Sequence, residues 1–140
     1  MQISQTPTDD TVTFPSNVRA ADAPTSAGKV LWHFSMSLDG FIAGPNRSFD
    51  WLADTPGIVD AYAATTGAVL AGRSGYDAMP DVSEIYGSAW EGPVFVLTHH
   101  PEDAPQAEGA TIISCDLEEA CRIGLEAARG KNLEVFSADI

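Results

Sequence analysis

The stretch AVLAGRSGYDAM, residues 68–79, decides which fold the sequence predicts. Its first five residues, Ala68 to Gly72, are apolar or small and predict a short buried strand. Arg73 follows at once, and Ser74 is placed to cap a short helix. A buried strand that turns directly into a helix is typical of layered α/β domains with a largely parallel sheet.

The flanking segments continue this alternation of strand and helix. Apolar runs predict four more strands, at residues 30–36, 93–98, 111–114 and 133–136. Helical spacing predicts helices at 55–66 and 117–129, while the stretch 83–92 is expected to be irregular and exposed. The order strand, helix, strand, short helix, strand, strand, helix, strand predicts one layered α/β domain.

The helix at 117–129 carries the clearest signals. Asp116 stands at its N-cap position, and Glu119 completes a capping-box pattern. Gly130 follows the helix as a stop. The apolar residues at helical spacing form one stripe, made of Leu117, Ala120, Cys121, Gly124, Leu125 and Ala128.

Length and charge exclude several classes of protein. The chain has 140 residues, which suits one domain, and it has 20 Asp and Glu against 7 Lys and Arg. This acidic balance argues against a general nucleic-acid binder and against attraction to an anionic membrane. No run approaches the ~20 apolar residues that span a bilayer. Residues 1–28 are expected to be a disordered leader, so that the ordered domain covers 29–140.

The cysteines and histidines do not predict a metal site. Cys115 and Cys121 are too few for a disulfide framework or a zinc knuckle, and we expect both to be reduced thiols in a cytoplasmic protein. His99 and His100 are neighbours on an extended chain, so their side chains point apart. No third ligand appears at a useful spacing.

Three candidate sites follow predicted strands, which is where open α/β sheets hold ligands. Asp39 follows the first strand, the turn 72–74 follows the second, and the small-residue loop 137–139 follows the last. Each has a plainer interpretation. Asp-Gly is a common turn pair, and spacing alone favours that interpretation for Asp39. The turn 72–74 is equally consistent with a capped helix and a solvated Arg73.

Taken together, the motifs match a family. They are SMSLDGFIAGPNRSFDWL (35–52), GAVLAGRSGYDAM (67–79), PVFVLTHH (93–100) and KNLEVFSADI (131–140). In this order and spacing they resemble the dihydrofolate-reductase-like proteins related to the reductase domain of the bacterial bifunctional riboflavin-biosynthesis deaminase-reductase. The resemblance implies a layered α/β sheet with flanking helices, and NADPH lying across the carboxyl ends of the strands.

The resemblance also implies roles for individual residues. The turn after the second strand meets the cofactor phosphates, the end of the 93–98 strand flanks the adenine ribose, and the last loop holds the pyrophosphate. The cofactor-binding residues would be Ala43, Gly72, Arg73, Ser74, Thr98, His99, Ser137, Ala138 and Asp139. Asp39 would face the substrate as the catalytic residue. The substrate pocket would include Ser37, Asp50 and Trp51.

The sequence departs from the family pattern in three ways. Gly75 stands where the family often has Thr, and the loop 137–139 is poorer in Gly than is common. The family continues beyond this point with a helix and further strands, which usually contribute to a homodimer. We therefore expect the chain to be the N-terminal part of such a domain, weakly stable and poor at binding NADPH.

Two functions follow as hypotheses. The first is an NADPH-dependent reductase of a small heterocyclic or ribosylated pyrimidine- or pterin-type substrate, present in incomplete form. The second is a non-catalytic remnant that binds a nucleotide or pairs with a homologous subunit. Asp39 and the turn 72–74 favour the enzyme, whereas Gly75 and the loop 137–139 favour the remnant.

Overall fold

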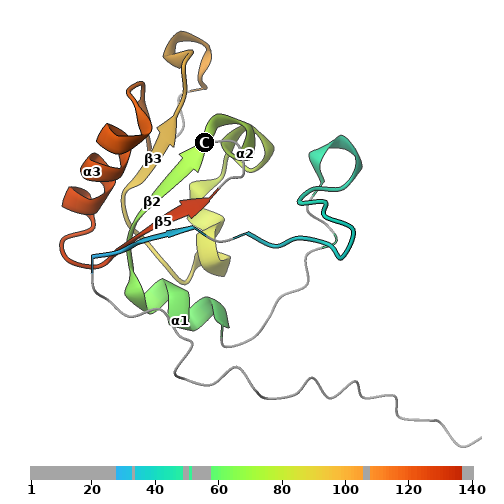
Figure 1. The fold of residues 1–140 in the computed structure, drawn as a ribbon, viewed down its shortest axis with the longest axis horizontal. Coiled ribbons are helices and arrows are strands. Elements are labelled where there is room, and N and C mark those ends of the chain that lie inside the picture. Colours follow the sequence, from blue (N-terminus) through green and yellow to red (C-terminus); the bar gives the residue numbers. More distant parts are fainter. Residues whose placement is uncertain (1–27, 33, 49–50, 52–57, 106–107, 137–140) are drawn as a thin grey trace, which may run out of the picture.

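The computed structural model describes residues 28–32, 34–48, 51, 58–105 and 108–136. Within them five strands form one sheet (Figure 1). The strands are β1 (Val30–Trp32), β2 (Thr66–Gly72), β3 (Val94–Leu97), β4 (Ala110–Ile113) and β5 (Asn132–Phe136). The helices are α1 (Ile58–Thr65), α2 (Arg73–Ala78), α3 (Leu117–Ala127) and three short 3-10 helices, η2 (Pro45–Arg47), η3 (Val82–Ser88) and η4 (Pro101–Asp103).

The strand order is β1-β5-β2-β3-β4, and every pairing is parallel. The last strand of the sequence therefore lies between the first two. The alternation of strand and helix and the parallel sheet confirm the predicted α/β class. A parallel sheet is buried on both faces, which explains the continuous apolar run of β2.

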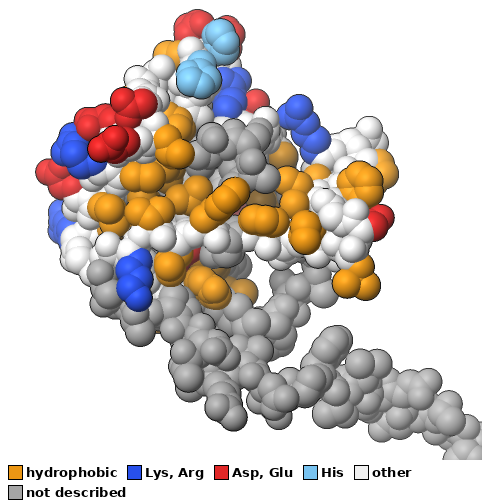
Figure 2. Space-filling model, viewed as in Figure 1, with side chains coloured by type: hydrophobic (Ala, Val, Ile, Leu, Met, Phe, Trp, Pro, Cys, Tyr) orange, Lys and Arg blue, Asp and Glu red, His pale blue; other side chains and the backbone are white. Residues whose placement is uncertain are grey.

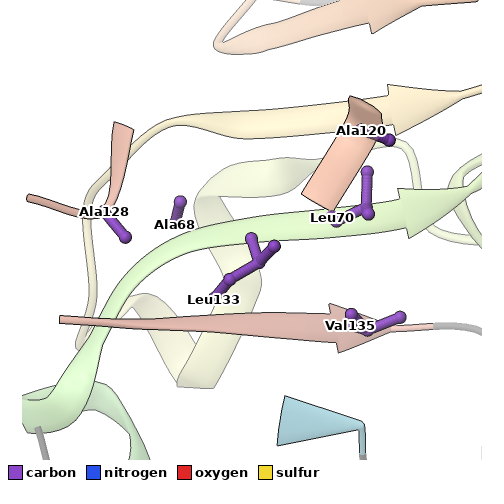
Figure 3. Close-up of a cluster of buried hydrophobic side chains, with 6 residues drawn as sticks. All are labelled: Ala68, Leu70, Ala120, Ala128, Leu133 and Val135. Carbon is purple, nitrogen blue, oxygen red and sulfur yellow. The ribbon is translucent and has the colours of Figure 1, made fainter. Parts of the chain in front are cut away.

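Helix α3 covers one face of the sheet over β2 and β5. Six buried side chains form the contact, as Figure 3 shows: Ala68, Leu70, Ala120, Ala128, Leu133 and Val135. Gly124 permits this close approach, because a Cβ there would lie 2.6 Å from Leu133 Cδ1. The predicted cap is present, since the backbone N–H of Glu119 donates to Asp116 Oδ1 at 2.8 Å.

The opposite face holds a second cluster of buried side chains, under η3. Val69, Trp90 and Val94 form it, with Tyr86 and Phe136 packed against them. The indole N–H of Trp90 donates to the carbonyl of Thr66 at 3.0 Å. The prediction that residues 83–92 are exposed was therefore wrong for this part of the stretch: Trp90 is only 8% exposed, because its indole lies on the sheet.

The edge strand β1 is shorter than the sequence predicts. It ends at Trp32, and the chain leaves the sheet after it (Figure 1). The apolar side chains that alternate along the expected strand are exposed. The exposed fraction is 42% for Val30, 61% for Trp32, 48% for Phe34 and 58% for Met36. Figure 2 shows hydrophobic side chains spread across the middle of this side of the molecule.

Several predictions fall on residues outside the described part of the chain. The expected leader 1–28 is described only at Gly28, and the expected first turn of the helix at 55–66 is described from Ile58 on. Asp50 and residues 137–139 also lie outside it. Cys115 and Cys121 are both free thiols. Burial raises the pKa of the Cys121 thiol, which keeps it protonated.

Candidate functional site

The carboxyl ends of three strands meet at one edge of the sheet. Ala71 of β2 pairs with Phe136 of β5, and Gly72 pairs with Leu97 of β3. Residues 73–74 and residues 137–139 therefore follow neighbouring strand ends in the sequence. The loop 137–139 itself lies outside the described residues.

Gly72 leads from β2 straight into α2. It is the N-cap of the helix in an extended conformation, with no side-chain hydrogen bond to cap it. Ser74 is thus inside the helix, and the prediction that it caps α2 was wrong. The turn itself is as short as the sequence indicates, and Ser74 and Gly75 face a large pocket.

Arg73 points toward the loop after β3. Its Nε donates to Asp77 Oδ1 at 2.7 Å, and its Nη2 donates to the carbonyl of Asp103 at 2.7 Å. Its Nη1 lies 3.5 Å from the carbonyl of His100. The side chain is 25% exposed, so it is neither a freely solvated arginine nor one directed at open solvent.

The end of β3 supplies the other residues expected at the cofactor. Thr98 is buried, its N–H donates to Ile113 O at 3.1 Å, and its Oγ1 accepts from the N–H of His100 at 3.1 Å. His99 is exposed beside it. Thr98 is thus fixed in place while His99 is open to a ligand.

A group of three exposed residues near this end has the chemistry of metal ligands. His100, Glu102 and Asp103 bring their ligand atoms within 4.8 Å of one another. Hydrogen bonding to its own backbone N–H lowers the pKa of Glu102. All three are neighbours on one surface loop, and exposed acidic groups often lie this close without an ion.

A large pocket of about 810 Å³ opens on the sheet face that carries η3. Its floor is made by Val69, Ala71 and Phe136 of the sheet. Ala43, from the segment after β1, lies at its side, together with Ser74 of α2. Pockets of this volume and apolar character are the usual sites of drug-sized ligands and cofactors.

Two tyrosines in the wall of this pocket were not predicted from the sequence. Tyr76 is 3% exposed, and its hydroxyl has no hydrogen-bond partner among the described residues. Tyr86 lies edge-on to Phe136, with ring centroids 5.6 Å apart, and burial raises its pKa. The sequence predicts the short helix that carries Tyr76. It does not predict the position of Tyr86, because the stretch around Tyr86 lacks a regular hydrophobic period.

A second pocket, of about 690 Å³, is lined by the loop that contains Asp39. Ser37, Asp39 and Trp51 line it, and Ala43 lines both pockets. Ser37 Oγ donates to Asp39 Oδ1 at 2.7 Å, and the N–H of Gly40 donates to Ser37 O at 3.0 Å. Asp39 is therefore part of a turn, as one interpretation of the sequence predicts, and it also lines a pocket.

Asp39 is exposed. The pocket beside it is open, and Trp51 is 40% exposed. In this arrangement Asp39 can accept hydrogen bonds from a ligand. Asp50, the remaining residue expected at the substrate, lies outside the described part of the chain.

Comparison with known proteins supports the fold. No protein-family model matches the chain, and no curated protein matches it. Among solved structures, it resembles the one described as "Putative riboflavin biosynthesis protein" from Shewanella sp. PV-4, with 24% identity and a TM-score of 0.57. The match covers 78% of this chain and 64% of that one. The chain thus shares a fold with that protein and spans about two thirds of its length.

No described helix has the length and apolar character needed to cross a membrane. Figure 2 shows acidic side chains gathered over α3 and near the upper tip of the molecule, beside the histidines. Such a surface agrees with the acidic balance of the sequence.

Proposed function

We propose that the chain is a dihydrofolate-reductase-like reductase domain of the riboflavin-biosynthesis type, which uses NADPH to reduce a small heterocyclic or ribosylated pyrimidine- or pterin-type substrate. The observation that carries the proposal is the shared edge of β2, β3 and β5. It aligns the turn 72–74 with Thr98 and His99, beside a pocket large enough for a nicotinamide ring and a substrate.

The residues present fit a dinucleotide in an extended conformation. His99 and Thr98 would lie along the ribose, and Gly72 lets the backbone approach the phosphates closely. The floor of the large pocket, at Ala71 and Phe136, is apolar and would hold the nicotinamide flat. The cofactor would supply the hydride, and the protein would supply orientation and exclusion of water.

The substrate would occupy the second pocket and reach the first past Ala43, which lines both. Phe41 and Trp51 offer apolar surface for a planar ring. Ser37 and Asp39 offer oxygen atoms that accept hydrogen bonds from ring N–H groups. Asp39 would thus orient the substrate rather than relay a proton from a dry site.

Titration with NADPH, followed by tryptophan fluorescence, tests the proposal. We expect weak, saturable binding by the unmodified protein, as the sequence predicts for the N-terminal part of such a domain, and at least tenfold weaker binding by Ala43→Phe, which fills the wall shared by the pockets. Ala64→Phe on the exposed side of α1 is the matched control and should bind as the unmodified protein does. A cooperatively folded protein that binds no NADPH would contradict the proposal.

The exposure of Asp39 favours a second candidate, a non-catalytic domain that binds a nucleotide or pairs with a homologous subunit. In that case NADPH or another nucleotide would bind at the strand ends without being oxidised. Steady-state assays of NADPH oxidation with pterin- and pyrimidine-type substrates separate the two candidates. Turnover that falls with Asp39→Asn supports the enzyme, and binding without turnover supports the second candidate.

A further inference from the structure

We propose that Arg73 is a positioning residue: it clasps the loop 98–104 against α2 and does not itself grip a cofactor phosphate. The clasp is a property of the folded chain alone, whereas its effect on the cofactor rests on the proposed function. The inference departs from the role that the resemblance implies for this side chain.

The guanidinium group of Arg73 donates hydrogen bonds to three acceptors. Nε donates to the carboxylate of Asp77, one helical turn further along α2, at 2.7 Å. Nη2 donates to the carbonyl of Asp103 at 2.7 Å, and Nη1 reaches the carbonyl of His100 at 3.5 Å. Because the donors of an arginine lie in one rigid plane, these acceptors fix the orientation of the whole group.

The loop has few strong contacts of its own. Its internal backbone hydrogen bonds, from Asp103 to His100 and from Ala104 to Pro101, are both 3.3 Å long. The contacts from Arg73 are shorter at Asp103 and come from a residue 30 positions earlier in the chain. Besides the hydrogen bond from the N–H of Thr98 to Ile113 O, Arg73 therefore supplies a second long-range anchor, which ties this loop to the start of α2.

The local charge also disfavours a phosphate on this side chain. Asp77 already neutralises the guanidinium, and Glu102 and Asp103 are exposed acids on the loop that it holds. A phosphate would have to displace the Asp77 carboxylate or share the guanidinium with it. The ion pair is partly exposed to solvent, which weakens it, so its main effect is to set geometry.

The clasp bears on the proposed cofactor site because the loop begins at Thr98 and His99. Thr98 Oγ1 accepts from the N–H of His100, and the carbonyl of His100 faces Arg73. Holding His100 therefore helps to set the direction in which His99 projects. Loss of Arg73 should disturb binding at this end of the site whichever dinucleotide is bound.

Amide hydrogen exchange of the whole chain without any ligand tests the clasp. We expect Arg73→Met and Asp77→Asn each to speed exchange in the segment 100–104, by roughly tenfold for the loss of a charge-assisted hydrogen bond. Arg122→Met is the matched control, because Arg122 also pairs with carboxylates, those of Glu119 and Glu126, on exposed α3. It should leave this segment unchanged.

Unchanged exchange at 100–104 in both Arg73→Met and Asp77→Asn would overturn the clasp. Asp77→Asn keeps the shape of the side chain, so the test stands even if Arg73→Met fails to fold. If Arg73→Met loses protection throughout the chain, unchanged exchange at 100–104 in Asp77→Asn overturns the clasp by itself.

Titration with NADPH and NADH separates the clasp from a phosphate grip. If Arg73 only clasps the loop, Arg73→Met weakens both dinucleotides by the same factor, and Asp77→Asn weakens them too. If Arg73 grips a phosphate, Asp77→Asn tightens binding because a competing carboxylate is gone, and Arg73→Met weakens NADPH alone for a grip on the 2′-phosphate or both dinucleotides for a grip on the pyrophosphate. Binding of neither dinucleotide to the unmodified protein would reject the proposed function, while the exchange experiment would still decide the clasp.

Discussion

Strands β5 and β1 pair with each other, yet they lie in opposite environments. β5 contains an asparagine and a glutamate, and nevertheless Asn132, Leu133, Glu134 and Val135 are buried. β1 reads Val-Leu-Trp, with no polar residue, and Trp32 is 61% exposed. The position in the sheet decides this: among the described strands, β5 has a neighbour on each side and is covered by α3, whereas β1 has one neighbour. From composition alone, β1 would be expected to be buried and β5 to be exposed.

A substitution at the centre of the sheet should have the largest effect on the free energy of unfolding. Leu133 is fully buried between Ala68, Ala120 and Gly124, so Leu133→Ala removes packing and leaves a cavity. We expect a loss of about 2–5 kcal/mol in the free energy of unfolding, measured by urea denaturation. A loss below about 1 kcal/mol, the usual range for surface sites, would show that β5 is not central.

A substitution where β1 meets β5 should have an intermediate effect on the free energy of unfolding. Asn132 Oδ1 accepts a hydrogen bond from the N–H of Lys29 at 3.2 Å, which ties the start of β1 to β5. Asn132→Ala leaves that N–H without its side-chain acceptor and should cost about 1–3 kcal/mol. Urea denaturation measures the cost, and faster amide exchange at Val30 and Leu31 should accompany it. Unchanged exchange in β1 would contradict this link.

The edge should tolerate substitution. Trp32 touches Phe34, with ring centroids 5.6 Å apart, but Trp32 is 61% exposed and Phe34 is 48% exposed. We expect Trp32→Thr to change the free energy of unfolding by less than about 0.5 kcal/mol, as surface substitutions do. It should also lower the binding of a hydrophobic dye, because the exposed apolar strip becomes smaller. A large loss of stability would mean that β1 is as buried as β5.

Helix α3 covers β5, and the ion pair on its outer side should have the smallest effect on the free energy of unfolding. Hydrogen bonding to Arg122 lowers the pKa of Glu119 below its ordinary value. A carboxyl group with a lowered pKa in the folded state favours folding above its ordinary pKa, and this contribution disappears as the pH falls through the lowered value. Because both side chains are exposed, the change in stability should be barely measurable. NMR titration of the Glu119 carboxyl should show the lowered pKa, and Arg122→Met should restore it.

The sequence was most informative where local chemistry decides the structure. The cap at Asp116, the run of β2 and the short turn at Gly72 all depend on neighbours in the chain, and each appears where it was expected. The parallel pairing followed from the alternation of strands and helices. The candidate site at the ends of β2 and β5 therefore rests on strand positions that the sequence predicts.

Distant contacts explain what the sequence did not reveal. Arg73 meets carbonyl groups 27 and 30 residues away, and no local pattern marks a backbone acceptor. Trp90 is buried because its indole reaches the carbonyl of Thr66, 24 residues earlier. The early end of β1 likewise depends on what covers it, and not on its own apolar residues.

Hydrogen exchange of the whole chain with and without NADPH is the most direct test of the central claim, that the neighbouring ends of β2, β3 and β5 form a dinucleotide site. The account predicts saturable protection at residues 72–75 and 98–100, with little change at the edge strand β1. Protection confined to other segments, or no protection at saturating NADPH, would contradict it.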